Sequence, residues 1–302
     1  MPVKIWIKAA RLRTLPLAIA GTLAGNLLAY SEQGEIRPLI FVLTVATALL
    51  LQILSNFAND YGDFKNGADT IERTDRVMAS GLITEPKMKA AIAILIILCL
   101  ITGIGLLIVS LEELNRSFWI LLALGIGGLF AAYFYTAGKK PYGYFGLGDL
   151  SVFLFFGLLS VMGTYYLQTQ TVESPAWFIA MSTGLLSSAV LNINNIRDIR
   201  SDEEKHKITL PVKIGYKNAL AYHFLLLTGA LLCVAIYTWL NYKSAFQVFF
   251  LVVMGVVLLR HYSALQKAAH KGRPAYNRQL KLLSLSTLGL TLCFCLSEVI
   301  YQ

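Results

Sequence analysis

The sequence predicts an all-α, polytopic membrane protein with nine transmembrane helices. Of its 302 residues, 56% are hydrophobic and only 14% are charged, which is unlike the composition of soluble domains. Apolar segments recur along the chain, each long enough to cross a hydrocarbon core of about 30 Å, which takes about 20 helical residues. The basic residues alternate between successive loops, as they do in proteins that cross the membrane repeatedly.

Nine apolar segments meet this length requirement. They are residues 14–31, 38–57, 90–111, 117–137, 149–168, 176–194, 218–240, 244–260 and 280–301. The first has no cleavage-site pattern and follows Arg11 and Arg13, so we interpret it as a retained helix and not as a signal peptide. Because no linker or low-complexity tract divides the chain, we expect residues 1–302 to form a single transmembrane domain.

The positions of the basic residues predict the orientation. With nine spans, 23 of the 26 Lys and Arg residues fall in the N-terminal tail and in the loops after even-numbered spans. The other side receives only Arg37, Arg116 and Lys243. The positive-inside rule then predicts a cytoplasmic N-terminus and an external C-terminus. We expect the membrane to be the inner membrane of a bacterium. The net charge of +9 therefore reflects topology, and we do not expect nucleic-acid binding.

Two polar stretches interrupt the apolar pattern on the predicted cytoplasmic side: "LSNFANDYGDFKNGAD", residues 54–69, and "NINNIRDIRSDEEKHKITLPVKIG", residues 192–215. At about 100° per helical residue, each places one Asn and two Asp within an arc of about 60°. These residues are Asn56, Asp60 and Asp63 in the first stretch and Asn195, Asp198 and Asp202 in the second. We call these two sets the first and the second acidic island.

A single island is explained well by helix capping and turn formation, in which Asp and Asn are common. Two islands that lie on the same side of the membrane, contain the same residue types and each present them on a single helix face favour a metal site instead. Clustered carboxylates repel each other unless a cation joins them, and all-oxygen ligands suit Mg²⁺ better than Zn²⁺. The four cysteines lie within predicted spans and form no CxxC pair, so they do not indicate zinc. We predict that the six island residues bind Mg²⁺.

Basic residues surround the islands. They are Lys65, Arg73 and Arg76 after the first, Arg197, Arg200, Lys205 and Lys207 in the second, and Lys139 and Lys140 in the loop between the fourth and fifth spans. Each of these residues on its own is explained by topology. Together with acids and a metal they predict a phosphate or diphosphate site. The chain has neither a GxxxxGK[ST] nor a GxGxxG motif, so a nucleotide is not indicated.

A third polar stretch, "YFYTAGKKPYGYFGLGDL", spans residues 133–150. Tyr135 has the position of an interfacial belt residue, and a catalytic role is the alternative. Asp149 begins an apolar span, where it either caps the helix or faces the same cavity as the islands.

Three motifs resemble the signature regions of the UbiA-type intramembrane aromatic prenyltransferases: "NDYGDFKNGAD", "NNIRDIRSDEEKHKITL" and "YTAGKKPYGYFGLGDL". The resemblance runs from "ARLRTLP" at residues 10–16 to "YNRQL" at 276–280 and covers nearly the whole chain. Within this superfamily, "RTLP" and "GLGDLSVFLFFGLLSVMG" resemble the branch that prenylates 1,4-dihydroxy-2-naphthoate in menaquinone biosynthesis.

The resemblance implies nine helices around a central cavity, with Mg²⁺ and a polyprenyl diphosphate at its cytoplasmic mouth. The first island would serve one metal-diphosphate site and the second island the other. The implied diphosphate ligands are Asn56, Asn195, Arg73, Lys207 and Lys139 or Lys140. The candidates for contact with the aromatic acceptor are Arg13, Tyr135 and Asp149, with Arg11 a further candidate for its carboxylate.

Two positions depart from the superfamily pattern. Gly67 stands where a third Asp is common, which leaves the role of the next acid, Asp69, open. His206 stands where a Gly commonly precedes the Lys of the second motif, which leaves the local turn open.

The implied reaction is Mg²⁺-dependent transfer of a polyprenyl group to dihydroxynaphthoate with loss of CO₂ and diphosphate, giving demethylmenaquinone. Prenylation of another acceptor, such as 4-hydroxybenzoate, is the alternative within the superfamily. A cation-coupled transporter is the alternative from another class, since it also uses intramembrane acids. The acids here lie at span ends, on one side and beside many cations, which favours the phosphate site.

Overall fold

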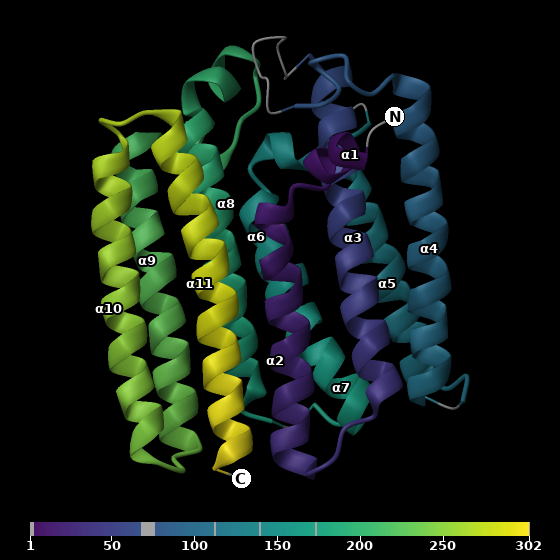
Figure 1. Ribbon diagram of the computed structural model, residues 1–302, viewed down its shortest axis with the longest axis vertical. Coiled ribbons are helices and arrows are strands. Elements are labelled where there is room, and N and C mark those ends of the chain that lie inside the picture. The colour runs from purple at the N-terminus through teal and green to yellow at the C-terminus, as the bar shows by residue number, and fades with distance from the viewer. Residues whose placement is uncertain (1–2, 68–75, 112, 139, 173, 302) are drawn as a thin grey trace.

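A computed structural model describes residues 3–67, 76–111, 113–138, 140–172 and 174–301, and every regular element in these ranges is helical (Figure 1). Within them, nine helical stretches are long and apolar enough to cross a membrane. The chain is therefore an integral membrane protein, and the predicted all-α class with nine spans is confirmed.

The first four spans are α2 (Leu15–Gln33), α3 (Pro38–Lys65), α4 (Glu85–Leu111) and α5 (Arg116–Phe134). The fifth is composite, formed by α6 (Gly148–Val152), the π-helical η3 (Phe153–Gly163) and α7 (Thr164–Thr169). The last four are α8 (Ala176–Glu204), α9 (Leu210–Leu240), α10 (Ala245–Ala268) and α11 (Arg273–Ile300). Three short helices lie at one end of the bundle: α1 (Val3–Ala10), η1 (Leu12–Thr14) and η2 (Tyr142–Phe145).

Helices extend beyond the predicted spans at one end of the bundle only. There α3 continues to Lys65 instead of ending at 57, α8 continues to Glu204 instead of 194, and α9 begins at Leu210 instead of 218. At the opposite end, observed and predicted boundaries agree within two residues. The reason is that hydropathy detects only the apolar part of a helix, whereas in α3 and α8 the backbone stays helical through the polar residues that follow. The extension of α9 has a kink at Gly215, whose φ of 78° and ψ of 164° are not helical. These extensions form the polar end of the bundle, at the top in Figure 1.

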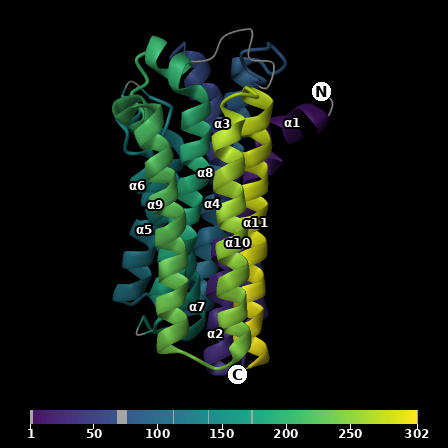
Figure 2. The same cartoon turned by 90° about the vertical axis from the view of Figure 1, so that its left-hand side faces the viewer.

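The bundle has two groups of helices on either side of α2. Figure 1 shows α8, α9, α10 and α11 on one side of α2 and α3, α4 and α5 on the other, with N and C marked at opposite ends. Figure 2 shows α1 projecting sideways from the bundle at the polar end. Trp6 of α1 packs on Phe57 of α3 with ring centroids 5.5 Å apart, which holds this short helix beside the first acidic island.

Glycines bring α2, η3 and α8 into close contact. A Cβ atom at Gly157 would lie 2.6 Å from the carbonyl oxygen of Ala180, and one at Gly25 would lie 2.4 Å from that of Val161. In a bilayer the lipid tails are as apolar as the side chains, so close backbone approach through small residues is a main source of helix association. We call the closely packed surface that α2, η3 and α8 form through these glycines the tight wall. In α5, by contrast, only Phe118 is buried.

Candidate active site

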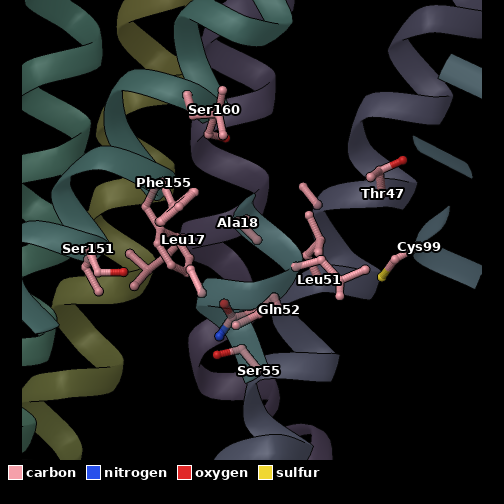
Figure 3. A pocket seen from close by; sticks show the side chains of 18 of the residues that line it. Leu17, Ala18, Thr47, Leu51, Gln52, Ser55, Cys99, Ser151, Phe155 and Ser160 are labelled. Carbon is pink, nitrogen blue, oxygen red and sulfur yellow. The ribbon is translucent and has the colours of Figure 1, made fainter. Parts of the chain in front are cut away.

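A cavity of about 380 Å³ is lined mainly by residues of α2, α3, α4, α5, η3 and α8. Its lining is mixed: Asn56, Asn195, Arg76 and Lys207 belong to the polar end, whereas Leu, Ile and Phe side chains line the membrane-embedded part. Figure 3 shows Leu17, Leu51 and Phe155 around this apolar part. The central cavity expected from the sequence is therefore present. Each acidic island contributes its Asn to the polar end of the lining, whereas the four island aspartates are not among the lining residues.

The first island occupies the last turns of α3. Asp60 and Asp63 have exposed fractions of 2% and 0%, and Asn56 is also buried. The Asn56 amide donates to the carbonyl oxygen of Ala10 at 2.8 Å, which links it to the end of α1. The backbone N–H of Met78 donates to Asp60 Oδ2 at 3.2 Å. Two neighbouring segments, the end of α1 and the segment at Met78, therefore hold this face of α3 in place.

The second island occupies the last turns of α8, and Asn195, Asp198 and Asp202 are all buried. Two guanidinium groups hold the Asp198 carboxylate. Arg197 Nη2 lies 2.6 Å from Asp198 Oδ2, and Arg273 Nη2, from the start of α11, lies 2.7 Å from Asp198 Oδ1. These charge-assisted contacts are short, as expected for ionised partners.

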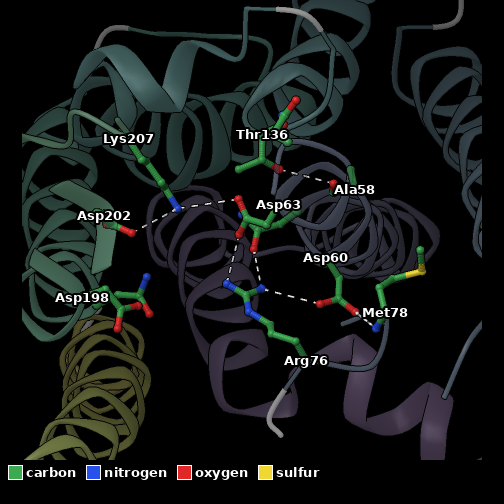
Figure 4. Close-up of polar contacts among 12 residues, drawn as sticks. Ala58, Asp60, Asp63, Arg76, Met78, Thr136, Asp198, Asp202 and Lys207 are labelled. Atoms are coloured by element: carbon green, nitrogen blue, oxygen red, sulfur yellow. Dashed lines mark hydrogen bonds and ion pairs between the residues drawn. The ribbon is translucent and has the colours of Figure 1, made fainter. Parts of the chain in front are cut away.

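Lys207 lies between the two islands (Figure 4). Its Nζ is 3.7 Å from Asp63 Oδ1 and 4.0 Å from Asp202 Oδ1. The acids of α3 and α8, far apart in the sequence, therefore share one cation at the polar end of the cavity. This convergence agrees with the placement of both islands on one side, as the sequence predicts.

The turn after α8 explains how Lys207 reaches this position. His206 has φ 53°, in the left-handed region. The N–H of Lys207 donates to the Asp202 carbonyl at 2.8 Å, and that of His206 donates to the Glu203 carbonyl at 3.1 Å. These bonds form a Schellman motif, which usually has Gly at the left-handed position. His206 thus keeps the turn that a Gly would make and returns the chain towards Asp202.

Arg76 is a site residue to which the sequence gave no role beyond that of a nearby cation. It is 6% exposed. Its Nη2 lies 3.1 Å from Asp63 Oδ2, and its Nη1 lies 2.8 Å from Asn59 Oδ1 and 3.8 Å from Asp60 Oδ1. Tyr144 of η2 was also missed, and its hydroxyl donates to Asp63 Oδ1 at 2.9 Å. Both residues come from segments between spans, whose path the sequence pattern does not predict.

The chemistry of the acids fits a hard divalent cation. Asp60 Oδ1 is buried and accepts no hydrogen bond from any described residue, so this oxygen has capacity for a metal ion. All six island side chains offer oxygen ligands, which Mg²⁺ prefers. In the described residues, no three acids, His or Cys already form a preassembled cluster, because Arg76 and Lys207 lie between the carboxylates.

Of the residues predicted to contact the acceptor, Arg13 and Tyr135 both line the cavity. Arg13 also donates to Asn277 Oδ1 at 3.4 Å. The Tyr135 ring lies against two glycines: a Cβ at Gly143 would be 2.9 Å from its Cε2, and one at Gly148 would be 2.8 Å from its hydroxyl. Burial raises the pKa of the Tyr135 phenol, which keeps it neutral and able to donate.

Asp149 is buried but is not among the cavity-lining residues, and its backbone carbonyl accepts from Ser188 at 3.1 Å. Its Oδ1, like that of Asp60, accepts no hydrogen bond from any described residue, and its contact with the acceptor stays a prediction. Lys140 is exposed and does not line the cavity. Arg73, Lys139 and Asp69 lie outside the described residues.

Comparison with known structures supports the fold. An apo structure of a UbiA homolog from Aeropyrum pernix K1 matches with a TM-score of 0.68 at 16% identity, covering 97% of this chain and 98% of that one. A UbiA homolog from Archaeoglobus fulgidus bound to GPP and Mg²⁺ matches with a TM-score of 0.64 at 14% identity, covering 96% and 99%.

Sequence comparison gives nearer relatives. A 1,4-dihydroxy-2-naphthoate octaprenyltransferase of Escherichia coli (strain K12) is 42% identical over 97% of this chain and 96% of its own length. Another from Haemophilus influenzae is 44% identical over 80% of both chains. The model of the UbiA prenyltransferase family matches residues 18–285. The resemblance inferred from the motifs is confirmed, and this chain is a transferase that belongs to the UbiA prenyltransferase family.

Proposed function

We propose that the chain transfers a polyprenyl group from polyprenyl diphosphate to 1,4-dihydroxy-2-naphthoate, with loss of diphosphate and CO₂. The observation that carries this proposal is the convergence of two acidic islands on Lys207 at the polar end of an apolar cavity. The names of the relatives in Escherichia coli and Haemophilus influenzae support the choice of acceptor. The product is demethylmenaquinone, formed in its reduced quinol state.

We assign Asn56, Asp60 and Asp63 to one Mg²⁺-diphosphate site, and Asn195, Asp198 and Asp202 to the other. When bound, Mg²⁺ would neutralise charge on the diphosphate oxygens and make the diphosphate a better leaving group. Arg76 and Lys207 each contact island carboxylates. In our proposal they turn to the diphosphate when the carboxylates take up the metal, because basic side chains stabilise the negative charge that develops there.

The polar and the apolar parts of the cavity lining would support successive steps of the reaction. The allylic carbon–oxygen bond breaks, and its electron pair leaves with the diphosphate. The apolar part of the cavity excludes water, so the ring attacks the allylic cation before water does. The ring carbon that carries the carboxylate forms the new carbon–carbon bond, and the carboxylate departs as CO₂ while its bonding electrons return to the ring.

Arg13 and Tyr135 are our candidates for holding the acceptor. Both line the cavity, and Arg13 has the charge to meet a carboxylate. Prenylation of 4-hydroxybenzoate is the alternative, because that acceptor also carries a carboxylate. Dihydroxynaphthoate has one ring more than 4-hydroxybenzoate. In an apolar site, that ring changes the binding free energy by several methylene equivalents of about 0.8 kcal/mol each. We therefore expect a preference for dihydroxynaphthoate of about a hundredfold.

A product assay with membranes that contain the chain tests the proposal. We expect a prenylated product whose mass lacks the carboxyl group, formed with dihydroxynaphthoate and Mg²⁺, lost with EDTA and restored by added Mg²⁺. Equal prenylation of 4-hydroxybenzoate, or retention of the carboxyl group, would show that the acceptor branch is wrong. We also propose that the polar end faces the cytoplasm of a bacterial inner membrane, as the distribution of basic residues predicts.

A further inference from the structure

Tyr144 contacts the first acidic island and Lys207, the cation that lies between the two islands. Its hydroxyl donates to Asp63 Oδ1 at 2.9 Å, and the ammonium of Lys207 lies over its ring, 5.3 Å from the centroid. Its backbone carbonyl accepts from the N–H of Ile208 at 3.1 Å. One residue of η2 is therefore bonded to the acid at the end of α3 and to the segment that follows α8.

The backbone of η2 is held firmly enough to give Tyr144 a defined position. Gly143 has no room for a side chain, since a Cβ there would lie 2.6 Å from the Tyr135 carbonyl oxygen. Gly146 ends the helix with φ 81°, and Lys213 Nζ donates to the Phe145 carbonyl at 2.8 Å. The glycines that the sequence shows in this stretch thus fix the loop in which Tyr144 lies.

The two contacts of Tyr144 act on groups of opposite charge. The hydroxyl orients the Asp63 carboxylate, as outer hydrogen bonds commonly orient metal-ligating carboxylates. The ring offers its negative face to the Lys207 ammonium. Lys207 lies 3.7 Å and 4.0 Å from its carboxylate partners, and its contact with the Tyr144 ring adds to these two ion pairs.

We infer that Tyr144 is a positioning residue that sets Asp63 and Lys207 relative to each other for binding of Mg²⁺-diphosphate. Its two parts have separable roles. The hydroxyl acts on the metal through Asp63, and the ring acts on the diphosphate through Lys207. The inference deepens the proposed function and rests on it for the identity of the ligand, but it does not depend on which aromatic acceptor is used.

Two variants separate these roles. Tyr144→Phe removes only the hydroxyl, so we expect the Mg²⁺ concentration for half-maximal activity to rise about tenfold, the lower end of typical losses at such positions. Tyr144→Leu also removes the ring, so the KM for polyprenyl diphosphate should rise about fivefold beyond that of Tyr144→Phe. The KM for the acceptor should change less than about twofold in both. Equal increases in the KM of both substrates would overturn the inference.

Tyr61→Leu is the matched control, because Lys89 lies over the Tyr61 ring at 5.9 Å and forms an ion pair with Glu85, which belongs to neither island. This variant should leave all three kinetic constants unchanged. Thermal unfolding and gel filtration without ligand show whether each variant is folded. If Tyr144→Leu does not fold, Tyr144→Phe alone decides the metal role, and Tyr144→Met, which keeps bulk without a ring, decides the diphosphate role.

A binding measurement separates this inference from the proposed function. The probe is inorganic diphosphate with Mg²⁺, and the readout is the increase in unfolding temperature that it gives to the purified chain. We expect a smaller increase for Tyr144→Phe than for the unmodified chain, and a still smaller one for Tyr144→Leu. If dihydroxynaphthoate is not prenylated but this order holds, the proposed acceptor fails and the role of Tyr144 stands. If all variants respond like the unmodified chain, Tyr144 is not a positioning residue.

Discussion

Arg76 Nη2 lies 3.1 Å from Asp63 Oδ2, and both side chains are almost completely buried. A buried carboxylate without a cation is costly, so Arg76 compensates Asp63 in the free chain. In the proposed function, metal binding to Asp63 would make the same guanidinium available to the diphosphate. One residue would therefore serve folding and catalysis in turn.

Replacement of Arg76 tests this double role. For Arg76→Gln we expect kcat/KM for polyprenyl diphosphate to fall at least about a hundredfold, equivalent to about 2.7 kcal/mol, because a charge-assisted contact to the leaving group is lost. The unfolding temperature should fall without Mg²⁺ and recover partly with it, since metal would replace the missing cation. Arg278→Gln, at an exposed position near the same end, is the control for a change in net charge. Unchanged turnover in Arg76→Gln would contradict a diphosphate contact.

The acidic islands give a direct prediction. Asp60→Asn or Asp198→Asn keeps the side-chain size and removes a ligand charge, so turnover should fall by orders of magnitude while the chain stays folded in the membrane. Glu203→Gln is the matched control, because Glu203 lies on α8 beside Asp202 and is exposed. Near-normal activity in both island variants would mean that these acids only cap helices.

The turn at His206 predicts an unusual pattern of tolerance. His206→Gly should keep activity, because Gly adopts the left-handed region without steric strain. His206→Val should raise the KM for polyprenyl diphosphate, since a β-branched residue is strained there and would displace Lys207. Lys205→Gly and Lys205→Val are the control for the loss of a polar side chain, because Lys205 has a φ of −107°, outside the left-handed region. Equal effects of Gly and Val at His206 would count against the turn as the cause.

Orientation in the membrane is tested by labelling single cysteines in a background without Cys99, Cys233, Cys293 and Cys295. Cysteines that replace Lys65 and Lys271, both exposed at the polar end, should react only with reagent on the cytoplasmic side. A cysteine in place of Glu113, exposed at the opposite end, should react only from outside. Reaction of Lys65→Cys or Lys271→Cys with external reagent would overturn the predicted topology.

The sequence predicts those features of the site that follow from helical periodicity. Asp60 and Asp63 share a face because they lie three residues apart on one helix, so their convergence needs no knowledge of tertiary structure. Arg76 and Tyr144 escape such reasoning, because their contacts depend on how two connecting segments fold back over the helix ends. Arg273 was missed for a related reason: it reaches Asp198 only because α11 begins beside α8.

The sequence left the roles of His206 and Asp149 open for other reasons. His206 left the turn open at the level of sequence, since a side chain at a left-handed position costs about 1–2 kcal/mol relative to Gly. The backbone bonds to Asp202 and Glu203 hold the turn in spite of that cost. For Asp149 the sequence offered a cap or a cavity residue. Its side chain is buried and does not line the cavity, and both alternatives stay predictions.

The glycine contacts of the tight wall have a consequence for inhibitors that fill the cavity. Gly157 and Gly25 are not among the residues that line the cavity, and a larger residue at either would collide with a neighbouring backbone, so resistance is not expected to arise there. Gly103 and Gly125 line the same cavity from α4 and α5, and a Cβ at either would meet no atom closer than 3.9 Å. Resistance to such compounds should therefore arise first on α4 and α5, where the cavity can be narrowed at little structural cost.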